Sequence, residues 1–327
     1  MKDHELYCMK FNPIYKQKTW GGTNIKEILK RDVDLPTIGE SWEVSTVDNN
    51  QTIIKNGLLK GKTLKEAIAQ FKEKLVGFEI YSKYNSDFPL LIKFIDAREP
   101  LSVQVHPNDE YARKYHDAYG KSEMWYILRA KPNSKINLGF NKALGKKVVD
   151  EIFKSNQIEN YLNDITVKSS DSFFVQAGTV HSIGANIFLL EIQQSSDITY
   201  RIFDYDRIDT VTNKKRELHK AQALNVIDFN ASIPNKNIYS RNLNVQNQLC
   251  HTPYFKSNIW FINETINKNL CDFDCFIILI CLEGKCMISC NNQNTQLIKG
   301  ETVLIPAAMD KVSIIPINTV ELIEVYI

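Results

Sequence analysis

Several features that mark exported, membrane-spanning or nucleic-acid-binding proteins are missing from this sequence. The first residues, MKDHELYCMKFNP, contain no apolar segment of signal-peptide length, so we expect that the protein is not exported. The apolar run CFIILICL (residues 275–282) is far shorter than the roughly 20 residues that a membrane-spanning helix needs. The 40 basic and 38 acidic residues nearly balance, which leaves no bulk charge to attract nucleic acid or an anionic membrane surface. We therefore expect a cytoplasmic protein that binds neither.

Cysteine pairs with the spacing of a zinc ribbon are also absent. The chain has seven cysteines, an odd number in a sequence without a signal for export, so reduced thiols are the simplest interpretation. Five of them lie in CDFDCFIILICLEGKCMISC (residues 271–290), where no two are separated by only two residues. We interpret them as structural thiols in strands, with a metal or redox site as the alternative.

What the sequence does contain is enough apolar material for a large core. Its 327 residues suggest two domains, at about 150 residues each. A hydrophobic content of 43%, with 14 tyrosines and 16 phenylalanines, excludes a disordered or low-complexity chain.

Most of the chain has the pattern of short strands. Segments rich in β-branched and aromatic residues, bounded by turn residues, predict strands within residues 41–47, 89–97, 101–106, 124–130, 164–178, 187–196, 198–206, 276–290 and 301–307. Helical periodicity is confined to residues 63–77, which end at a glycine, to residues 107–120, which begin with cap residues, and to residues 141–164. Many short strands separated by turns favour a jelly roll or barrel.

The Asn-rich segment at residues 232–250 is typical of a domain junction. We therefore predict a mainly β protein of two β-sandwich modules. The first spans residues 1–234 and carries the helical insertions, and the second spans residues 235–327.

One strand breaks the apolar pattern. In LSVQVHPND (residues 101–109), valines alternate with Ser102, Gln104 and His106, so these three polar side chains share one face of a strand. That face is either exposed to water or part of a site.

Two later segments supply further metal-binding groups. Glu123 enters the apolar strand GKSEMWYIL, where a carboxylate buried without a partner would cost several kcal/mol. In SFFVQAGTVHSIG, a turn at Gly178 allows His181 to point back into a barrel. Together with Gln104 and His106, these residues offer two imidazoles, a carboxylate and an amide oxygen to a zinc, manganese or iron ion. Ordinary hydrogen bonding among buried polar groups is the alternative, and spacing alone does not decide.

The order Gln-x-His, Glu, Gly-x-x-His on successive strands resembles the metal-binding pattern of cupin barrels. The segments PLLIKFIDAREPLSVQVHPND, GKSEMWYIL, QAGTVHSIG and LLEIQQSSDITYRIFDYDR then resemble the short bacterial form of the type I mannose-6-phosphate isomerases, also called phosphomannose isomerases. KTWGG, GESWEVST and ELHKAQALNVIDF match the same family. The resemblance runs through most of residues 10–230 and more loosely to the end. It implies two cupin-type modules, and the second is expected to be metal-free because KGETVLIPAAMDKV has no histidine at the ligand position.

The resemblance implies an aldose–ketose isomerase that interconverts mannose 6-phosphate and fructose 6-phosphate through a metal-stabilised cis-enediol(ate). The family binds one Zn²⁺ per chain, and its ligands fall on Gln104, His106, Glu123 and His181. We expect a sugar phosphate as the only partner of a monomer or weak homodimer.

The family's substrate pocket also maps onto this chain. Its active-site arginine falls on Arg201 and a pocket carboxylate on Glu191, and Ser102, Lys121 and Arg207 match positions that contact the sugar phosphate. We expect Arg201, Glu191 and Lys121 to be catalytic, and Ser102, Lys121 and Arg207 to bind substrate. The proton-transferring base is left open between Glu191, Lys121 and a metal-bound water.

The chain departs from the family at one turn. The family usually has Pro-Ala-Gly before the last metal ligand, whereas this chain has Gln176-Ala177-Gly178. Because proline there only restricts the backbone, the change bears on local rigidity and not on the ligand.

Two other functions share parts of this pattern. Non-haem iron oxygenases on cupin barrels use two histidines and one carboxylate, but Gln104 as a fourth ligand would reduce the open positions that oxygen activation needs. A cupin that binds a sugar phosphate without turnover is the second alternative, and the charged set Lys121, Glu191 and Arg201 argues against it.

Overall fold

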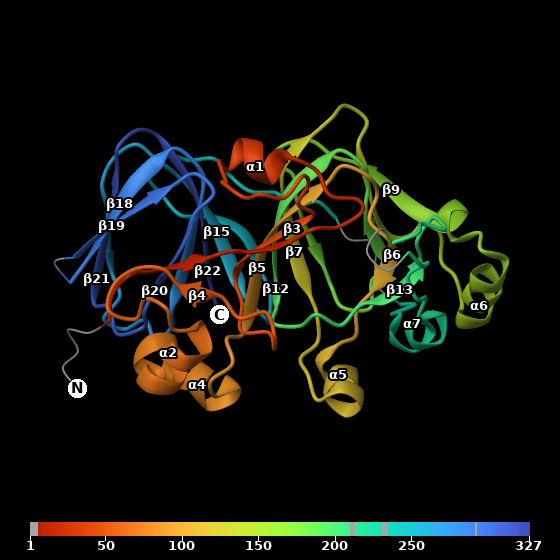
Figure 1. The fold of residues 1–327 in the computed structure, drawn as a ribbon, viewed down its shortest axis with the longest axis horizontal. Coiled ribbons are helices and arrows are strands. Elements are labelled where there is room, and N and C mark those ends of the chain that lie inside the picture. Colours follow the sequence, from red (N-terminus) through yellow and green to blue (C-terminus); the bar gives the residue numbers. More distant parts are fainter. Residues whose placement is uncertain (1–5, 210–212, 231–234, 292) are drawn as a thin grey trace.

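The computed structural model describes residues 6–209, 213–230, 235–291 and 293–327. Two β modules lie side by side, with the C-terminal part of the chain at the left of Figure 1 and the middle part at the right. All strand pairs in their sheets are antiparallel. The predicted mainly β fold is thus confirmed.

The first module contains two sheets. In spatial order, the six-stranded sheet consists of β10 (Ser172–Val175), β7 (Glu123–Ala130), β12 (Ile187–Gln194), β5 (Leu90–Ala97), β3 (Glu40–Val44) and β2 (Ile14–Lys16). The five-stranded sheet consists of β13 (Tyr200–Phe203), β6 (Val103–Val105), β11 (His181–Ile183), β8 (Lys135–Phe140) and β9 (Leu162–Thr166).

The second module also contains two sheets. The seven-stranded sheet consists of β14 (Asn247–His251), β15 (Lys256–Ile262), β22 (Val320–Tyr326), β17 (Ile277–Glu283), β20 (Thr302–Ile305), β1 (Met9–Asn12) and β4 (Ile53–Ile54). The four-stranded sheet consists of β16 (Ile266–Asn269), β21 (Lys311–Pro316), β18 (Lys285–Cys290) and β19 (Gln293–Ile298).

The N-terminal strands β1 and β4 therefore complete a sheet of the second module, because β1 pairs with β20 through Met9 and Leu304. The predicted boundary between residues 234 and 235 adjoins residues 231–234, which lie outside the described residues. The two domain ranges stay a prediction.

Helices surround the sheets. They are α1 (Asn24–Ile28), α2 (Leu64–Phe71), α3 (Glu73–Val76), α4 (Phe78–Tyr84), α5 (Asp109–His116), α6 (Lys146–Ser155) and α7 (Lys220–Val226), with the 3₁₀ turn η2 (Ile158–Tyr161). In Figure 1, α2 and α4 lie below the second module, and α6 and α7 lie at the far end of the first. No helix in the described ranges is long and apolar enough to cross a membrane.

The predicted helix at residues 63–77 is broken. Thr63 and Glu66 form a capping box at the start of α2, which buries the apolar face that the periodicity indicated. At Lys72 the backbone φ is +51°, a left-handed value that ends α2 before α3 begins. The helix predicted at residues 107–120 is shorter, as α5, and the Asn108 side chain accepts a hydrogen bond from the Tyr111 N–H at its start.

The six-stranded sheet lies between two of the three hydrophobic cores that the described residues form, and it determines where the site lies. β5 and β12 are buried along their whole length, so both faces of the sheet are covered. Ile92 and Phe94 pack in the hydrophobic core that extends into the second module, whereas Ile95 packs in the core inside the first. Because side chains alternate along a strand, Lys93 must point to the same side as Ile95. Lys93 therefore points into the interior of the first module.

Candidate active site

Strand pairing brings three of the predicted site residues into one row. β6 lies between β13 and β11 in the five-stranded sheet. Gln104 on β6 is paired with Arg201 on β13 and with His181 on β11. Residues directly opposite one another in a sheet point to the same face, so these side chains project into the barrel together.

Two histidines and one carboxylate meet at the centre of the barrel. Glu123 Oε1 lies 3.4 Å from His181 Nε2, and Glu123 Oε2 lies 3.6 Å from His106 Nε2. All three side chains are at most 1% exposed, and their ligand atoms lie within 4.8 Å of one another. The structure thus brings together the residues that the sequence predicted as metal ligands.

Backbone carbonyls orient both imidazole rings. His106 Nδ1 lies 2.8 Å from the Ile198 carbonyl oxygen, and His181 Nδ1 lies 2.9 Å from the Thr179 carbonyl oxygen. Because a carbonyl only accepts, each Nδ1 must carry the proton and each Nε2 must present its lone pair to Glu123. Burial lowers the pKa of His181 to about 4 and holds that of His106 well below its usual value, so both rings are neutral at pH 7.

Gln104 completes the set of four donors. Its amide nitrogen lies 3.3 Å from His181 Nε2. Rotation of the amide by 180° would place the Gln104 oxygen there, and that oxygen is a suitable metal ligand.

The carboxylate of Glu123 has no hydrogen-bond donor of its own. Both of its oxygens are buried without a hydrogen-bond partner, and the nearest charge, Lys121 Nζ, stands 3.5 Å from Oε2. Burial, followed by the negative charge of Glu191, raises the pKa of Glu123 to about 8. Buried acceptors of this kind are destabilising unless a hydrogen-bond donor or a cation satisfies them. His106 Nε2 and His181 Nε2 both face this carboxylate, so the three side chains fit a divalent metal centre.

A second row of polar residues crosses the facing sheet. Trp42, Lys93, Glu191 and Trp125 lie opposite one another on β3, β5, β12 and β7. Glu191 accepts hydrogen bonds from Lys93 Nζ at 3.2 Å and from Trp125 Nε1 at 3.1 Å. Burial alone would raise the pKa of Glu191, but the positive charges of Lys93 and Lys121 outweigh it and hold the pKa below its usual value. Glu191 is therefore ionised at neutral pH.

A polar cavity of about 300 Å³ opens beside this centre. The predicted residues Ser102, Gln104, Lys121, Glu191 and Arg201 all line it. Arg207 does not line it, because its guanidinium donates to the Pro100 carbonyl oxygen and to Asp204 instead.

Arg201 brings a half-buried positive charge to this cavity. Its Nη1 donates to the Glu217 carbonyl oxygen at 2.8 Å, while its Nε is buried without a partner among the contacts described. Burial and the nearby charge of Arg216 lower the pKa of Arg201, which shows that cations are crowded here. An anion in the cavity would relieve that crowding.

The cavity has further charged residues that the sequence did not single out: Lys18, Glu40, Lys93, Asp197 and Arg216. The sequence could have indicated Lys93, since it is the one charged residue among the apolar residues of PLLIKFI. No feature of the sequence indicates Glu40. In the structure, the positive charges of Lys18 and Lys93 outweigh the effect of burial and lower the pKa of Glu40 to about 2.

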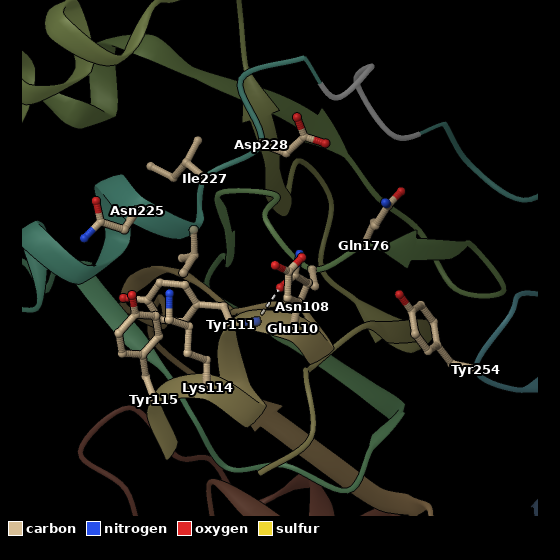
Figure 2. A pocket seen from close by; sticks show the side chains of 12 residues that line it. Asn108, Glu110, Tyr111, Lys114, Tyr115, Gln176, Asn225, Ile227, Asp228 and Tyr254 are labelled. Atoms are coloured by element: carbon tan, nitrogen blue, oxygen red, sulfur yellow. Dashed lines mark hydrogen bonds between the residues drawn. The ribbon is translucent and has the colours of Figure 1, made fainter. Parts of the chain in front are cut away.

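Another cavity, of about 490 Å³, shares no lining residue with this one. Figure 2 shows it between the start of α5, the turn at Gln176 and the segment after α7, with Tyr254 across from Tyr111. Asn108 at its floor is engaged in capping α5.

Comparison with protein families gives two matches. Residues 8–142 match the catalytic domain of phosphomannose isomerase type I. Residues 246–327 match the cupin domain of mannose-6-phosphate isomerase.

Individual relatives cover nearly the whole chain. The mannose-6-phosphate isomerase ManA of Bacillus subtilis is 33% identical over 301 residues, which is 90% of this chain and 92% of the relative. The mannose-6-phosphate isomerase of Streptococcus mutans is 33% identical over 294 residues, 89% of each chain. A crystal structure of mannose 6-phosphate isomerase from Bacillus subtilis superposes with a TM-score of 0.88 at 30% identity, covering 98% of this chain and 100% of that one. The Salmonella typhimurium phosphomannose isomerase shares the fold, with a TM-score of 0.80 at 15% identity and coverage of 98% and 99%.

Proposed function

The chain belongs to the type I mannose-6-phosphate isomerase family, whose reaction is the aldose–ketose interconversion of mannose 6-phosphate and fructose 6-phosphate, and we propose how its residues perform it. Membership of this family sets aside the iron oxygenase and the sugar-phosphate binder without turnover. The family depends on a metal, and His106, Glu123 and His181 form a cluster that could hold one.

We propose that Gln104, His106, Glu123 and His181 hold one Zn²⁺. The observation that carries this proposal is the Glu123 carboxylate, whose buried oxygens have no hydrogen-bond partner while two histidine lone pairs face them. Two imidazoles, one carboxylate and one amide oxygen suit zinc's preference for four nitrogen and oxygen ligands. When bound, the ion would act as a Lewis acid that stabilises negative charge on adjacent oxygens.

Glu191 is our choice for the group that moves the proton between carbons 1 and 2 of the sugar, through a cis-enediol(ate). It lines the cavity, and Lys93 and Trp125 fix its two oxygens before substrate arrives. Its lowered pKa keeps it ionised, as a base must be. Lys121 is the alternative, because its Nζ lies 3.1 Å from His106 Nε2 at the metal side of the same cavity.

The remaining predicted residues would orient the substrate. Arg201 places a positive charge on the row that also contains Gln104, where it would stabilise charge developing on a sugar oxygen. Ser102, 4% exposed on the cavity wall, would donate a hydrogen bond to the sugar phosphate. Lys121 would add a further positive charge for that group.

We propose that the enzyme works in the cytoplasm as a monomer or weak homodimer, with residues 1–234 as the catalytic domain and residues 235–327 as a metal-free cupin domain. All seven cysteines are free, which agrees with a reducing compartment. The nearly neutral net charge of +2 gives no reason to expect nucleic acid or membrane as a partner.

An isomerase assay combined with elemental analysis tests the proposal. Purified protein should convert mannose 6-phosphate and contain about one zinc per chain. Dialysis against a chelator should abolish activity, and added zinc should restore it more fully than manganese or iron(II). Full activity in protein shown to be metal-free would refute the metal centre, and better recovery with another ion would refute zinc.

A further inference from the structure

Binding the phosphate group of the substrate requires positive charge. The cavity wall contains a basic residue for this purpose that neither the sequence pattern nor the metal cluster indicates. We propose that Arg216, positioned by Asp204 and standing near Arg201, binds the substrate phosphate. This inference rests on the proposed function, because it assigns a phosphate-binding residue in the same cavity.

The chain path explains how Arg216 reaches the cavity. After β13 the chain doubles back on itself, since Ile208 pairs with Lys215 and the Asp209 N–H donates to the Lys214 carbonyl oxygen at 2.9 Å. The return brings Arg216 back to the end of β13, where it lines the same cavity as Ser102 and Arg201. Lys215, the preceding residue, instead pairs with the exposed Asp206 at 2.7 Å and is not on the cavity wall.

Asp204 fixes the position of the Arg216 side chain through two hydrogen bonds. One carboxylate oxygen accepts from Arg216 Nε at 2.7 Å and the other from Arg216 Nη2 at 2.5 Å, which is the two-bonded fork that arginine forms with carboxylates. Asp204 is 5% exposed, and its hydrogen bonds to Arg216 and Arg207 outweigh burial and lower its pKa, so it is ionised. Among the contacts between described residues, none uses Arg216 Nη1. A guanidinium fixed in this way loses little further freedom when it binds an anion.

Arg207 engages the same carboxylate but cannot serve the same purpose. Its Nη2 donates to Asp204 at 2.6 Å and its Nη1 to the Pro100 carbonyl oxygen. It does not line the cavity. Arg207 therefore anchors Asp204, and of the two arginines that bind Asp204 it is Arg216 that lines the cavity.

The charges on the cavity wall fit a dianion. Five basic and three acidic side chains line the cavity. Lys93 is paired with Glu191, and Lys18 is paired with Glu40 at 3.2 Å. Arg201 donates to a backbone carbonyl, and Arg216 shares Asp204 with Arg207, so neither guanidinium has a carboxylate to itself. Two such guanidiniums match the charge of a phosphate dianion and can donate hydrogen bonds to its oxygens.

The test compares Arg216→Ala with Lys215→Ala, which removes the same charge one residue away and outside the cavity. Arg216→Ala should raise KM for mannose 6-phosphate by about 10- to 100-fold, the usual loss for one charge-assisted hydrogen-bonding group, and change kcat by less than about threefold. The inhibition constant of inorganic phosphate should rise by a similar factor. Lys215→Ala should leave both constants within about twofold of wild type.

Changes below twofold in both constants for Arg216→Ala, or a fall in kcat alone, would overturn the assignment. Should the alanine variant fold poorly by circular dichroism, Arg216→Lys keeps the charge but loses the fork, and an intermediate rise in KM is expected; wild-type KM in that variant would also overturn it. Asp204→Asn tests positioning and should raise KM less than Arg216→Ala, with kcat kept.

Calorimetry with inorganic phosphate alone separates this inference from the proposed function. If wild-type protein binds phosphate and Arg216→Ala does not, Arg216 is a phosphate ligand even in a protein that fails to isomerise the sugar. If wild-type protein isomerises the sugar and both proteins bind phosphate equally, the isomerase stands and the Arg216 assignment fails.

Discussion

In each module, one of the buried glutamates of the larger sheet is held by a tryptophan and a lysine. In the first module, Glu191 on β12 accepts from Trp125 Nε1 and Lys93 Nζ. Trp125 lies on β7, the strand next to β12.

In the second module, Glu324 on β22 accepts from Trp260 Nε1 at 3.0 Å and from Lys268 Nζ. Trp260 lies on β15, the strand next to β22. The two modules thus share a glutamate–tryptophan–lysine unit inside a β fold.

Within the part of the chain that the structure describes, the two modules differ in whether they contain a buried carboxylate whose oxygens lack hydrogen-bond donors. Both oxygens of Glu191 and both oxygens of Glu324 are hydrogen-bonded, so these carboxylates are satisfied within the protein. Glu123 has two unsatisfied oxygens, and it belongs to the one cluster of three or more metal-binding side chains found in the described ranges. Hydrogen bonds within the protein thus satisfy Glu191 and Glu324, whereas the unsatisfied oxygens of Glu123 mark a site for a cation. Glu191 differs from Glu324 in lining the cavity beside that site.

The largest effect should come from removing that unsatisfied carboxylate. We expect Glu123→Gln to lose most of its zinc and to lower kcat/KM by at least about 10³-fold, because an uncharged amide binds the ion less tightly and the reaction loses several kcal/mol of charge stabilisation. Elemental analysis and the isomerase assay measure both quantities. Glu324→Gln is the matched control, with zinc content and kcat/KM within about twofold of wild type. Equal losses in both variants would mean that the two buried glutamates do not differ in role.

The next largest effect distinguishes a catalytic from a structural role for the two glutamate–tryptophan–lysine units. Glu191→Gln should lower kcat by about 10²- to 10⁴-fold, the range for a lost general base, while zinc remains bound. Glu324→Gln should leave kcat unchanged and lower only the free energy of unfolding, since it weakens a buried charged hydrogen-bond pair. Steady-state kinetics and urea unfolding distinguish these outcomes. If Glu191→Gln keeps more than about a tenth of wild-type kcat, Lys121 becomes the better choice for the base.

The cluster of candidate metal ligands could be predicted from the sequence because the signals of its residues are local. Gln104 and His106 interrupt an alternating strand, and Glu123 enters an apolar strand, so each departs from a pattern read within a few residues. The resemblance to the family then grouped these residues with His181 as one set of ligands.

Other features depend on contacts between distant segments and could not be predicted. Arg216 lies in KKRELHK, which has the composition of an exposed loop, and only the return of the chain to β13 brings it to the cavity. The pairing of β1 with β20 joins residues almost 300 positions apart, and β1 has no pattern that identifies its partner strand. The break at Lys72 is also hidden, because the apolar periodicity continues across it.

A smaller effect concerns the pH dependence of the first module's charge network. Glu40 accepts from Trp42 Nε1 at 2.7 Å and pairs with Lys18, and its pKa of about 2 in the folded state is below the ordinary 4.5. A group whose pKa is lowered by folding stabilises the protein above its unfolded pKa and loses that contribution as the pH falls. The difference corresponds to about 3 kcal/mol at pH 6, of which roughly 2 kcal/mol is lost by pH 3.

The variant Glu40→Gln isolates this contribution. Urea unfolding of chelator-treated wild-type and Glu40→Gln protein should show a gap in unfolding free energy that is about 2 kcal/mol smaller at pH 3 than at pH 6. Glu283→Gln removes an exposed carboxylate of the second module, paired with Lys299, and should change stability by no more than about 0.5 kcal/mol at either pH. A gap for Glu40→Gln that is the same at both pH values would contradict the lowered pKa.

The smallest effect comes from two turns that the modules have in common. In the first module, β10 is followed by a turn in which the Thr179 N–H donates to the Gln176 carbonyl oxygen at 3.1 Å. In the second, β20 is followed by a turn in which the Met309 N–H donates to the Pro306 carbonyl oxygen at 3.2 Å. Position 176 thus corresponds to a position where this same chain accommodates proline.

Gln176→Pro should therefore increase the free energy of unfolding by about 0.4–1 kcal/mol, because proline restricts the unfolded chain more than the folded turn. Activity should stay at the wild-type level, since Gln176 lines the cavity of Figure 2 and not the one beside the metal cluster. Urea unfolding and the isomerase assay check both expectations. The contrasting variant is Gly178→Ala, which should destabilise the protein: φ there is +90°, and an added Cβ would lie 3.0 Å from the Asp228 Cβ. If Gln176→Pro were destabilising as well, the backbone conformation at residue 176 would differ from that at residue 306. The two turns would then share only the hydrogen bond that closes them.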